Sequence, residues 1–420
     1  MTPSEAMRLQ IARQIAHWQA AVTTINEPSN FAAAEAWASV ERYLDLSLRR
    51  QLQGAIDRLR KDVAALERDL AAVRTQEELL AVQARLVLFR QRYVRVETTL
   101  DFYGDAINTR TNPKLRSHLR ALDLIASRSM EAILRPLGRP VPPALTYIDK
   151  GLGASILRAG IRLWDEDTVS PAAAIKITRH NLYRPTSLIH ETGHQVAHLL
   201  GWTEEFAALL SKEIGPAAPP EVVRIWEETA SEVVPDIFAF AHCGYAAVAA
   251  LHDVVAADQD SVLRYLPGDP HPIPFIRVLL NVELCRRAFG AGPWDDLAAS
   301  WRQLHRPERA EPATRLFLER SLELLPRLAA LALDRPMRAL GGRPLTALLD
   351  PMRVHPAALQ KWAGQLGEAL YTSPYWAGAE PVRLLALSGL RMALEPGRAR
   401  ETAQEFEAWT LRVGSFSRAA

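Results

Sequence analysis

Residues 190–194 read His190-Glu191-Thr192-Gly193-His194, and this five-residue pattern decides both the local fold and the chemistry that it can support. In an α-helix, residues four apart project from the same face, so the two histidines share one side of one helical turn. The preceding stretch, residues 184–189, contains a proline and two hydroxyl residues suited to open a helix. The HExxH pattern therefore predicts a helix whose two histidines bind one metal ion, with Glu191 directed at an open coordination position.

Gly193 is the one poor helix former within the motif. Because glycine has no Cβ, we expect another segment of the chain to approach the helix closely at this position. Beyond the motif, Ala197 and Leu200 stand where a metzincin would need glycine and a third histidine. The third ligand must therefore come from elsewhere in the chain.

A pair of carboxylates with helical spacing follows downstream, at Glu232 and Asp236. Residues four apart share a helix face, so Glu232 can bind a metal while Asp236 hydrogen-bonds the far nitrogen of a metal-bound histidine. Glu228, four residues earlier on the same face, is an alternative ligand. Pro235 lies inside the pattern, removes one helical hydrogen bond and is expected to kink the helix. We favour Glu232 because only Glu232 has an aspartate at the required spacing.

The combination of HExxH with a later ExxxD resembles the gluzincins, the thermolysin-like zinc metallopeptidases, over residues 154–277. The resemblance implies that His190, His194 and Glu232 bind Zn²⁺ and that Glu191 is the general base. It also implies that Asp236 orients a zinc-bound histidine.

Charge develops on the substrate carbonyl oxygen during peptide hydrolysis, and a donor besides the metal is needed to stabilise it. His271 lies in a loop rich in proline and is our candidate for this catalytic role, with Tyr183 as a second candidate. Residues 174–179 have the alternation of a strand. Gluzincins use an edge strand before the motif helix to hold an extended peptide, and the resemblance assigns that role to this strand.

Composition limits the remaining function classes. Lys and Arg total 50 against 48 Asp and Glu, so the balance favours neither nucleic acid nor an anionic membrane as a partner. No stretch has the length of a transmembrane helix, and the N-terminus lacks a signal sequence. The two cysteines, Cys243 and Cys285, are too few for a disulfide framework. These features predict a soluble cytoplasmic protein and remain compatible with non-classical export.

A heptad pattern governs the N-terminal third of the chain. In residues 52–73 and again in residues 79–93, apolar residues alternate spacings of four and three, which is typical of a coiled-coil seam. Thr75 and Glu78 form a capping box between the two runs. The pattern predicts an antiparallel helical hairpin. Self-association, or the binding of a protein partner, is the function that we expect of this arm if it has one beyond packing.

The fold class that follows is mainly α-helical, with a small mixed α+β zincin-like core. We predict three parts, namely a helical domain over residues 1–139, a catalytic domain over 140–305 and a helical region over 306–420. Further strands are expected at residues 146–148 and 155–164. Residues 237–251 are expected to continue the ligand helix in buried form, and the later helices are expected at residues 312–333, 356–371 and 380–407.

Two functions from different classes fit these observations. The first is a zinc-dependent metallopeptidase that hydrolyses peptide or protein substrates. The alternative is a non-catalytic binding or structural protein, or a delivered effector, whose helical arm engages a partner and whose zinc site is structural or regulatory. Glu191 favours the first function, because a structural zinc site needs no base beside its ligands.

Overall fold

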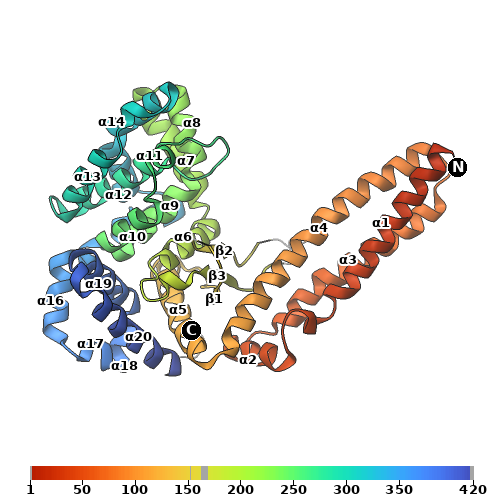
Figure 1. The fold of residues 1–420 in the computed structure, drawn as a ribbon, viewed down its shortest axis with the longest axis horizontal. Coiled ribbons are helices and arrows are strands. Elements are labelled where there is room, and N and C mark those ends of the chain that lie inside the picture. Colours follow the sequence, from red (N-terminus) through yellow and green to blue (C-terminus); the bar gives the residue numbers. More distant parts are fainter. Residues whose placement is uncertain (1, 152, 162–168, 417–420) are drawn as a thin grey trace. The chain divides into compact units, whose positions relative to one another are not determined.

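The structure, a computed structural model, describes residues 2–151, 153–161 and 169–416 (Figure 1). The chain divides into two compact units. One unit comprises Met1–Arg116, Leu157–Ala174 and Arg418–Ala420, and the other comprises Ser117–Ile156 and Ile175–Ser417. The protein is mainly helical with one small sheet, as predicted. The predicted division into three domains stays a prediction.

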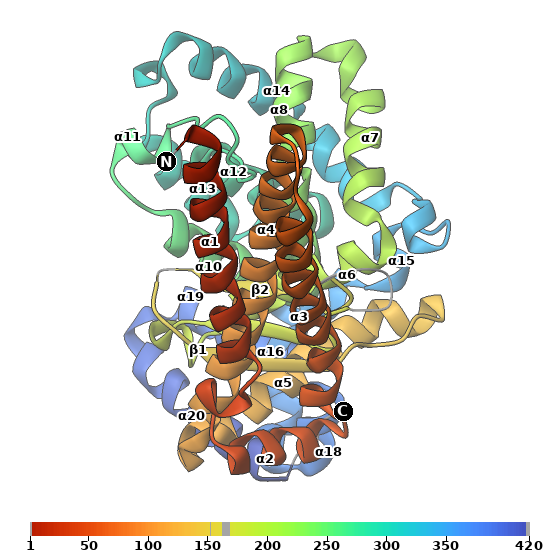
Figure 2. The same cartoon turned by 90° about the vertical axis from the view of Figure 1, so that its right-hand side faces the viewer.

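Three long helices make up most of the first unit, and Figures 1 and 2 show them running side by side. Their bounds are α1 (Pro3–Ile25), α3 (Leu48–Ala72) and α4 (Gln76–Asn108), with the shorter α2 (Ala34–Leu44) between the first two. The predicted apolar residues of α3 and α4 are buried along their whole length. Thr75 and Glu78 form the predicted capping box at the start of α4.

The helix α1 was not part of the predicted hairpin, yet it packs against both α3 and α4. Its buried residues Ile11, Ile15, Val22 and Ile25 have spacings of four, seven and three, which is the same heptad rhythm. The arm is therefore built from three helices instead of two.

The sheet contains three strands, β1 (Ala144–Ile148), β2 (Ser155–Leu157) and β3 (Ala173–Ile177), in the order β1-β3-β2. The strands predicted from residue 146, from residue 155 and from residue 174 are all present. The second is much shorter than predicted, and residues 162–164 of that prediction lie outside the described residues. The expectation that residues 174–179 form an edge strand is wrong, because β3 is paired on both sides.

Helices surround the HExxH motif in the second unit. The helix that contains the motif, α6 (Ser187–Leu200), packs against α9 (Ala230–Cys243). The flanking helices are α5 (Pro113–Leu134), α7 (Trp202–Ile214), α8 (Pro220–Glu228), α10 (Tyr245–Val255), α11 (Gln259–Val262), α12 (Pro274–Phe289) and α13 (Pro293–Leu304). None of the helices in the described part of the chain is long and apolar enough to cross a membrane.

Three predicted helices are interrupted at glycine or proline. The helix predicted at residues 356–371 ends at Gly367, which has a φ of 51° and separates α16 (Pro356–Leu366) from α17 (Ala369–Thr372). The buried run after the ligand helix breaks at Gly244, which has a φ of 56° and separates α9 from α10. Pro396 and Gly397 likewise divide the predicted helix at residues 380–407. The C-terminal helices are α14 (Pro312–Asp334), α15 (Leu345–Leu348), α16 (Pro356–Leu366), α17 (Ala369–Thr372), α18 (Pro374–Ala379), α19 (Pro381–Leu394) and α20 (Ala399–Phe416).

Candidate metal centre

The two histidines of the motif project from the same side of α6. Their ring centroids are 4.9 Å apart and the ring planes are nearly perpendicular, at 85°. Gly201 ends the helix about two turns after His194, in a left-handed conformation with a φ of 63°. The local geometry of His190 and His194 is thus the one that the four-residue spacing predicts.

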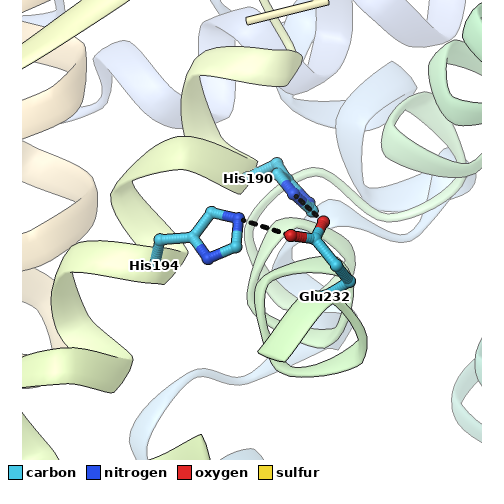
Figure 3. A group of neighbouring side chains, drawn as sticks. All are labelled: His190, His194 and Glu232. Atoms are coloured by element: carbon cyan, nitrogen blue, oxygen red, sulfur yellow. Dashed lines mark ion pairs between the residues drawn. The ribbon is translucent and has the colours of Figure 1, made fainter. Parts of the chain in front are cut away.

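Glu232, in the first turn of α9, faces both imidazoles (Figure 3). One carboxylate oxygen, Oε2, lies 3.3 Å from His190 Nε2, and the other, Oε1, lies 3.5 Å from His194 Nε2. One potential ligand atom from each residue lies within 4.8 Å of the other two. Among the residues that the structure describes, this is the one such group of three or more, and it can hold a metal ion.

Asp236 lies one turn after Glu232 on α9 and accepts a hydrogen bond from the other nitrogen of His190. The distance from His190 Nδ1 to Asp236 Oδ1 is 2.9 Å. In the neutral ring that binds a metal, a proton held on Nδ1 leaves Nε2 as the nitrogen with a free electron pair, and Nε2 is the atom that faces Glu232. Asp236 therefore fixes both the orientation of the His190 ring and its tautomer.

Arg277 of α12 is buried behind the carboxylates and compensates their charge. Its guanidinium donates to Asp236 at 2.7 and 2.9 Å and to Glu232 at 3.4 Å. Asn281, one turn later on α12, donates to Asp236 at 3.4 Å. These contacts satisfy the inner oxygens of Asp236, which is 5% exposed and would otherwise be an unpaired buried charge.

The charges of the site act strongly on one another. Burial raises the pKa of Glu232, but His190, His194 and Arg277 outweigh burial and hold it at about 2. Burial lowers the pKa of His190, but Asp236 and Glu232 outweigh it and raise that pKa to about 9. The region between the two imidazoles and the carboxylate therefore favours positive charge, as a metal-binding position requires.

Gly193 allows α6 and α9 to approach closely enough for these contacts. A Cβ built on Gly193 would lie 2.9 Å from Pro235 Cα and 3.2 Å from Phe238 Cβ. Such distances are shorter than carbon atoms tolerate, so any side chain at this position would push the helices apart. The close approach expected from the sequence is present, and α9 continues through Pro235.

Glu191 is 7% exposed and borders a cavity of about 140 Å³. The same cavity is lined by His190, Asp236, His271, Arg277 and, on its apolar side, small residues of α10 such as Ala247. Burial raises the pKa of Glu191 to about 7, with a smaller contribution from Glu232. The motif glutamate thus lies beside the ligand group and borders a space that a small molecule can enter.

His271 reaches the same group from the loop before α12. Its Nε2 atom lies 3.2 Å from Glu232 Oε2, and its Nδ1 atom lies 2.7 Å from Asp269 Oδ1. Its side chain is 51% exposed, in contrast to the buried residues behind it. The loop therefore brings a third imidazole to the solvent side of the site, oriented by a carboxylate.

The competing candidates lie elsewhere. Glu228, at the end of α8, is 46% exposed and pairs with Arg224 at 2.6 Å, outside the ligand group. The Tyr183 hydroxyl donates to Glu407 of α20 at 3.1 Å. Of the two carboxylates that the sequence left open, Glu232 is the one that the structure places beside the histidines.

Sequence reasoning gave Arg277 and Asn281 no role in the site. Both belong to the sequence Pro274-Phe275-Ile276-Arg277-Val278-Leu279-Leu280-Asn281, in which they are the two polar residues of an otherwise apolar run. They are four residues apart and therefore share one helix face. A polar pair with helical spacing in a buried helix is the signal that could have identified them.

Comparison of the chain with protein-family models, with curated proteins and with solved structures found no match. The interpretation of the site therefore depends on its own residues and geometry.

Proposed function

We propose that this chain is a zinc-dependent metallopeptidase of the gluzincin type. The observation that supports it most is the joint placement of two imidazoles, a carboxylate and a second glutamate, Glu191, beside one cavity. A purely structural metal site needs its ligands but has no use for a buried glutamate next to them. The arrangement therefore favours catalysis over the alternative of a binding protein with a structural metal.

His190, His194 and Glu232 would hold the ion, and two nitrogens with one carboxylate oxygen are a donor set that suits zinc. Zinc in such a site supplies a Lewis acid and makes hydroxide available near neutral pH. Asp236 keeps His190 in the tautomer that offers Nε2, and Arg277 holds Asp236 in place. In this proposal the buried network has a positioning role and does not touch the substrate.

Glu191 is the proposed general base. Its carboxylate accepts a proton from the attacking water and returns that proton to the nitrogen of the leaving amine. Its position next to His190 in the motif, and its place at the cavity wall, support this role.

His271 is the proposed donor to the oxygen that becomes negatively charged in the transition state. Its imidazole lies at the exposed side of the ligand group, and Asp269 accepts from its Nδ1 atom, so Nε2 is directed toward the site. The form that donates from both nitrogens is the imidazolium, and it is the form proposed to act here. A donor fixed before the reaction stabilises developing charge without reorganisation, which is how such groups accelerate acyl transfer.

The substrate is proposed to be an extended peptide. Because β3 is the central strand, the edge available next to the site is β2, which begins directly after the cavity-lining residues Gly153 and Ala154. Backbone hydrogen bonds to such an edge bind any extended chain, while side-chain pockets select among sequences. We therefore assign to β2 the role that the sequence had suggested for β3.

The test is Glu191→Gln, assayed for cleavage of a diverse peptide pool by the zinc-loaded full chain. We expect the variant to keep its zinc and to lose about two to four orders of magnitude in cleavage rate, the usual contribution of a general base. Glu204→Gln, an exposed glutamate in the first turn of α7, is the matched control and should cleave like the unchanged chain. Undiminished cleavage by Glu191→Gln, or no cleavage by the unchanged chain, contradicts the proposal.

A further inference from the structure

The helix α4 of the arm has a row of exposed apolar side chains. Leu80, Val87, Leu88 and Val94 are 52%, 47%, 52% and 46% exposed, although all four are large and apolar. Leu80, Val87 and Val94 are spaced by seven residues, so they form one line along the helix. Isolated exposed leucines are ordinary, but a regular row of this kind indicates an interaction surface.

The row is the core of a second heptad seam. Ala84, Gln91 and Thr98 complete it at the alternating spacings of four and three, and all three are exposed and uncharged. The buried seam of α4, which contains Leu79 and Leu86, lies on another face and packs within the three-helix arm. We refer to residues 80, 84, 87, 88, 91, 94 and 98 as the outer seam of α4.

Charged residues of α3 do not cover the outer seam. Arg85 of α4 pairs with Asp69 of α3, and Arg92 pairs with Asp62 at 3.1 Å. These ion pairs direct the two arginines toward α3 and away from the seam. The surface offered to a partner is therefore uncharged along its centre, with apolar side chains at residues 80, 84, 87, 88 and 94.

The residues beside the outer seam decide which helix fits it. In a parallel pair of identical helices, flanking residues five apart in sequence face one another across the seam. Arg90 and Arg95 have this relation, so a parallel pair would bring two like charges together. A parallel second copy is therefore disfavoured.

An antiparallel second copy removes this conflict when the pair is centred near residue 86. Residues whose numbers add up to about 172 then face one another, and Glu77 of one copy meets Arg95 of the other. By the same rule Arg90 meets Gln83, and Ala84 packs against Val87 and Leu88. Neither Glu77 nor Arg95 makes an ion pair within the described residues of the single chain.

We propose that the outer seam of α4 pairs antiparallel with the outer seam of a second copy of this chain. Residues 77–95 span about 27 Å of helix, because each residue adds about 1.5 Å. An interface of one helix per copy and this length lies at the low end of the range for specific complexes. The dimer is accordingly weak and forms in a concentration-dependent manner. This inference is independent of the proposed peptidase activity.

Sedimentation velocity of the full chain across a concentration series tests the surface. The unchanged chain should pass from monomer to dimer, and Val87→Glu should raise the dimer dissociation constant by about tenfold or more, because it places a charge in the apolar seam. Leu316→Glu makes a matched change at a leucine of α14 that is 49% exposed, and it should leave dimerisation unaltered. A chain that stays monomeric at all concentrations overturns the proposal, as does a dimer that tolerates Val87→Glu.

Charge reversal tests the antiparallel register. Arg95→Glu places a carboxylate opposite Glu77 of the second copy, and Glu77→Arg places a guanidinium opposite Arg95. Each single variant should weaken the dimer about three- to tenfold, since the contact occurs twice in a symmetric pair. The double variant restores opposite charges and should recover the original dissociation constant. Additive weakening in the double variant contradicts this register.

Discussion

The three-helix arm and the metal centre are both helical, but they depend on their sequences in different ways. In the arm, α3 and α4 pack through a long series of interchangeable apolar residues with a heptad spacing. In the candidate metal centre, the contact between α6 and α9 depends on a few particular residues, such as Gly193 and Asp236. The arm is therefore expected to tolerate single substitutions, whereas the stability of the centre is expected to depend on a small buried polar network.

Arg277→Met is expected to produce the largest loss of stability. It removes the buried guanidinium that donates two hydrogen bonds to the carboxylate of Asp236, and removal of one partner of a buried ion pair costs about 3–5 kcal/mol. Chemical denaturation of the metal-free protein measures the effect.

Arg287→Met on the same helix is the matched control. Arg287 pairs with Asp334 at 2.7 Å but is 52% exposed, and an exposed pair contributes about 0–1 kcal/mol. Equal losses of stability in the two variants would show that the buried ion pair contributes no more to stability than the exposed one.

Acid is expected to destabilise the protein through a buried histidine of α9, His242. Burial, with a smaller effect of Arg353, lowers the pKa of His242 to about 3. The unfolded chain binds a proton at this residue below pH about 6.5, while the folded chain does not, so stability falls as the pH drops from about 6.5 toward 3. The slope approaches about 1.4 kcal/mol per pH unit.

His242→Leu should remove this contribution. When the pH falls from 6.5 to 4.5, the free energy of unfolding should decrease by about 2–3 kcal/mol less in the variant than in the unchanged chain. Denaturant titration at each pH measures it. His17→Leu, at an exposed histidine of α1, is the control in the arm. Parallel pH profiles for His242→Leu and the unchanged chain would refute the interpretation.

A glycine-to-alanine change is expected to have opposite effects on stability in the two regions. Gly193→Ala forces a Cβ against Pro235 and should cost about 1–3 kcal/mol while weakening metal binding. Gly54→Ala in α3 meets nothing within 4 Å, and alanine is the better helix former, so stability should rise by about 0.5–1 kcal/mol. Thermal denaturation of both variants provides the measurement. The same sign for both would contradict the distinction between the regions.

Local periodicity is what could be predicted from the sequence. The motif helix, the capping box at Thr75 and the heptads of α3 and α4 depend on residues close together in the chain. The placement of Glu232 and Asp236 on one helix face could also be predicted from the sequence, because four-residue spacing determines which side chains share a face.

Contacts between distant elements could not be predicted in the same way. The central position of β3 depends on which strands flank it, and the role of Arg277 depends on how α12 packs against α9. The spacing of Arg277 and Asn281 shows that the two share a helix face, but neither segment records which distant element it contacts. The break at Gly244 was missed because mostly apolar residues with helical character lie on both sides of it.

The central claim is that His190, His194 and Glu232 together hold one zinc ion. Elemental analysis by plasma mass spectrometry of the purified chain, after equilibration with zinc and removal of the excess, tests it most directly. We expect close to one zinc ion per chain, and a loss of that zinc in His190→Ala and in Glu232→Ala, with His17→Ala as the control. Zinc that stays stoichiometric in His190→Ala would contradict the account.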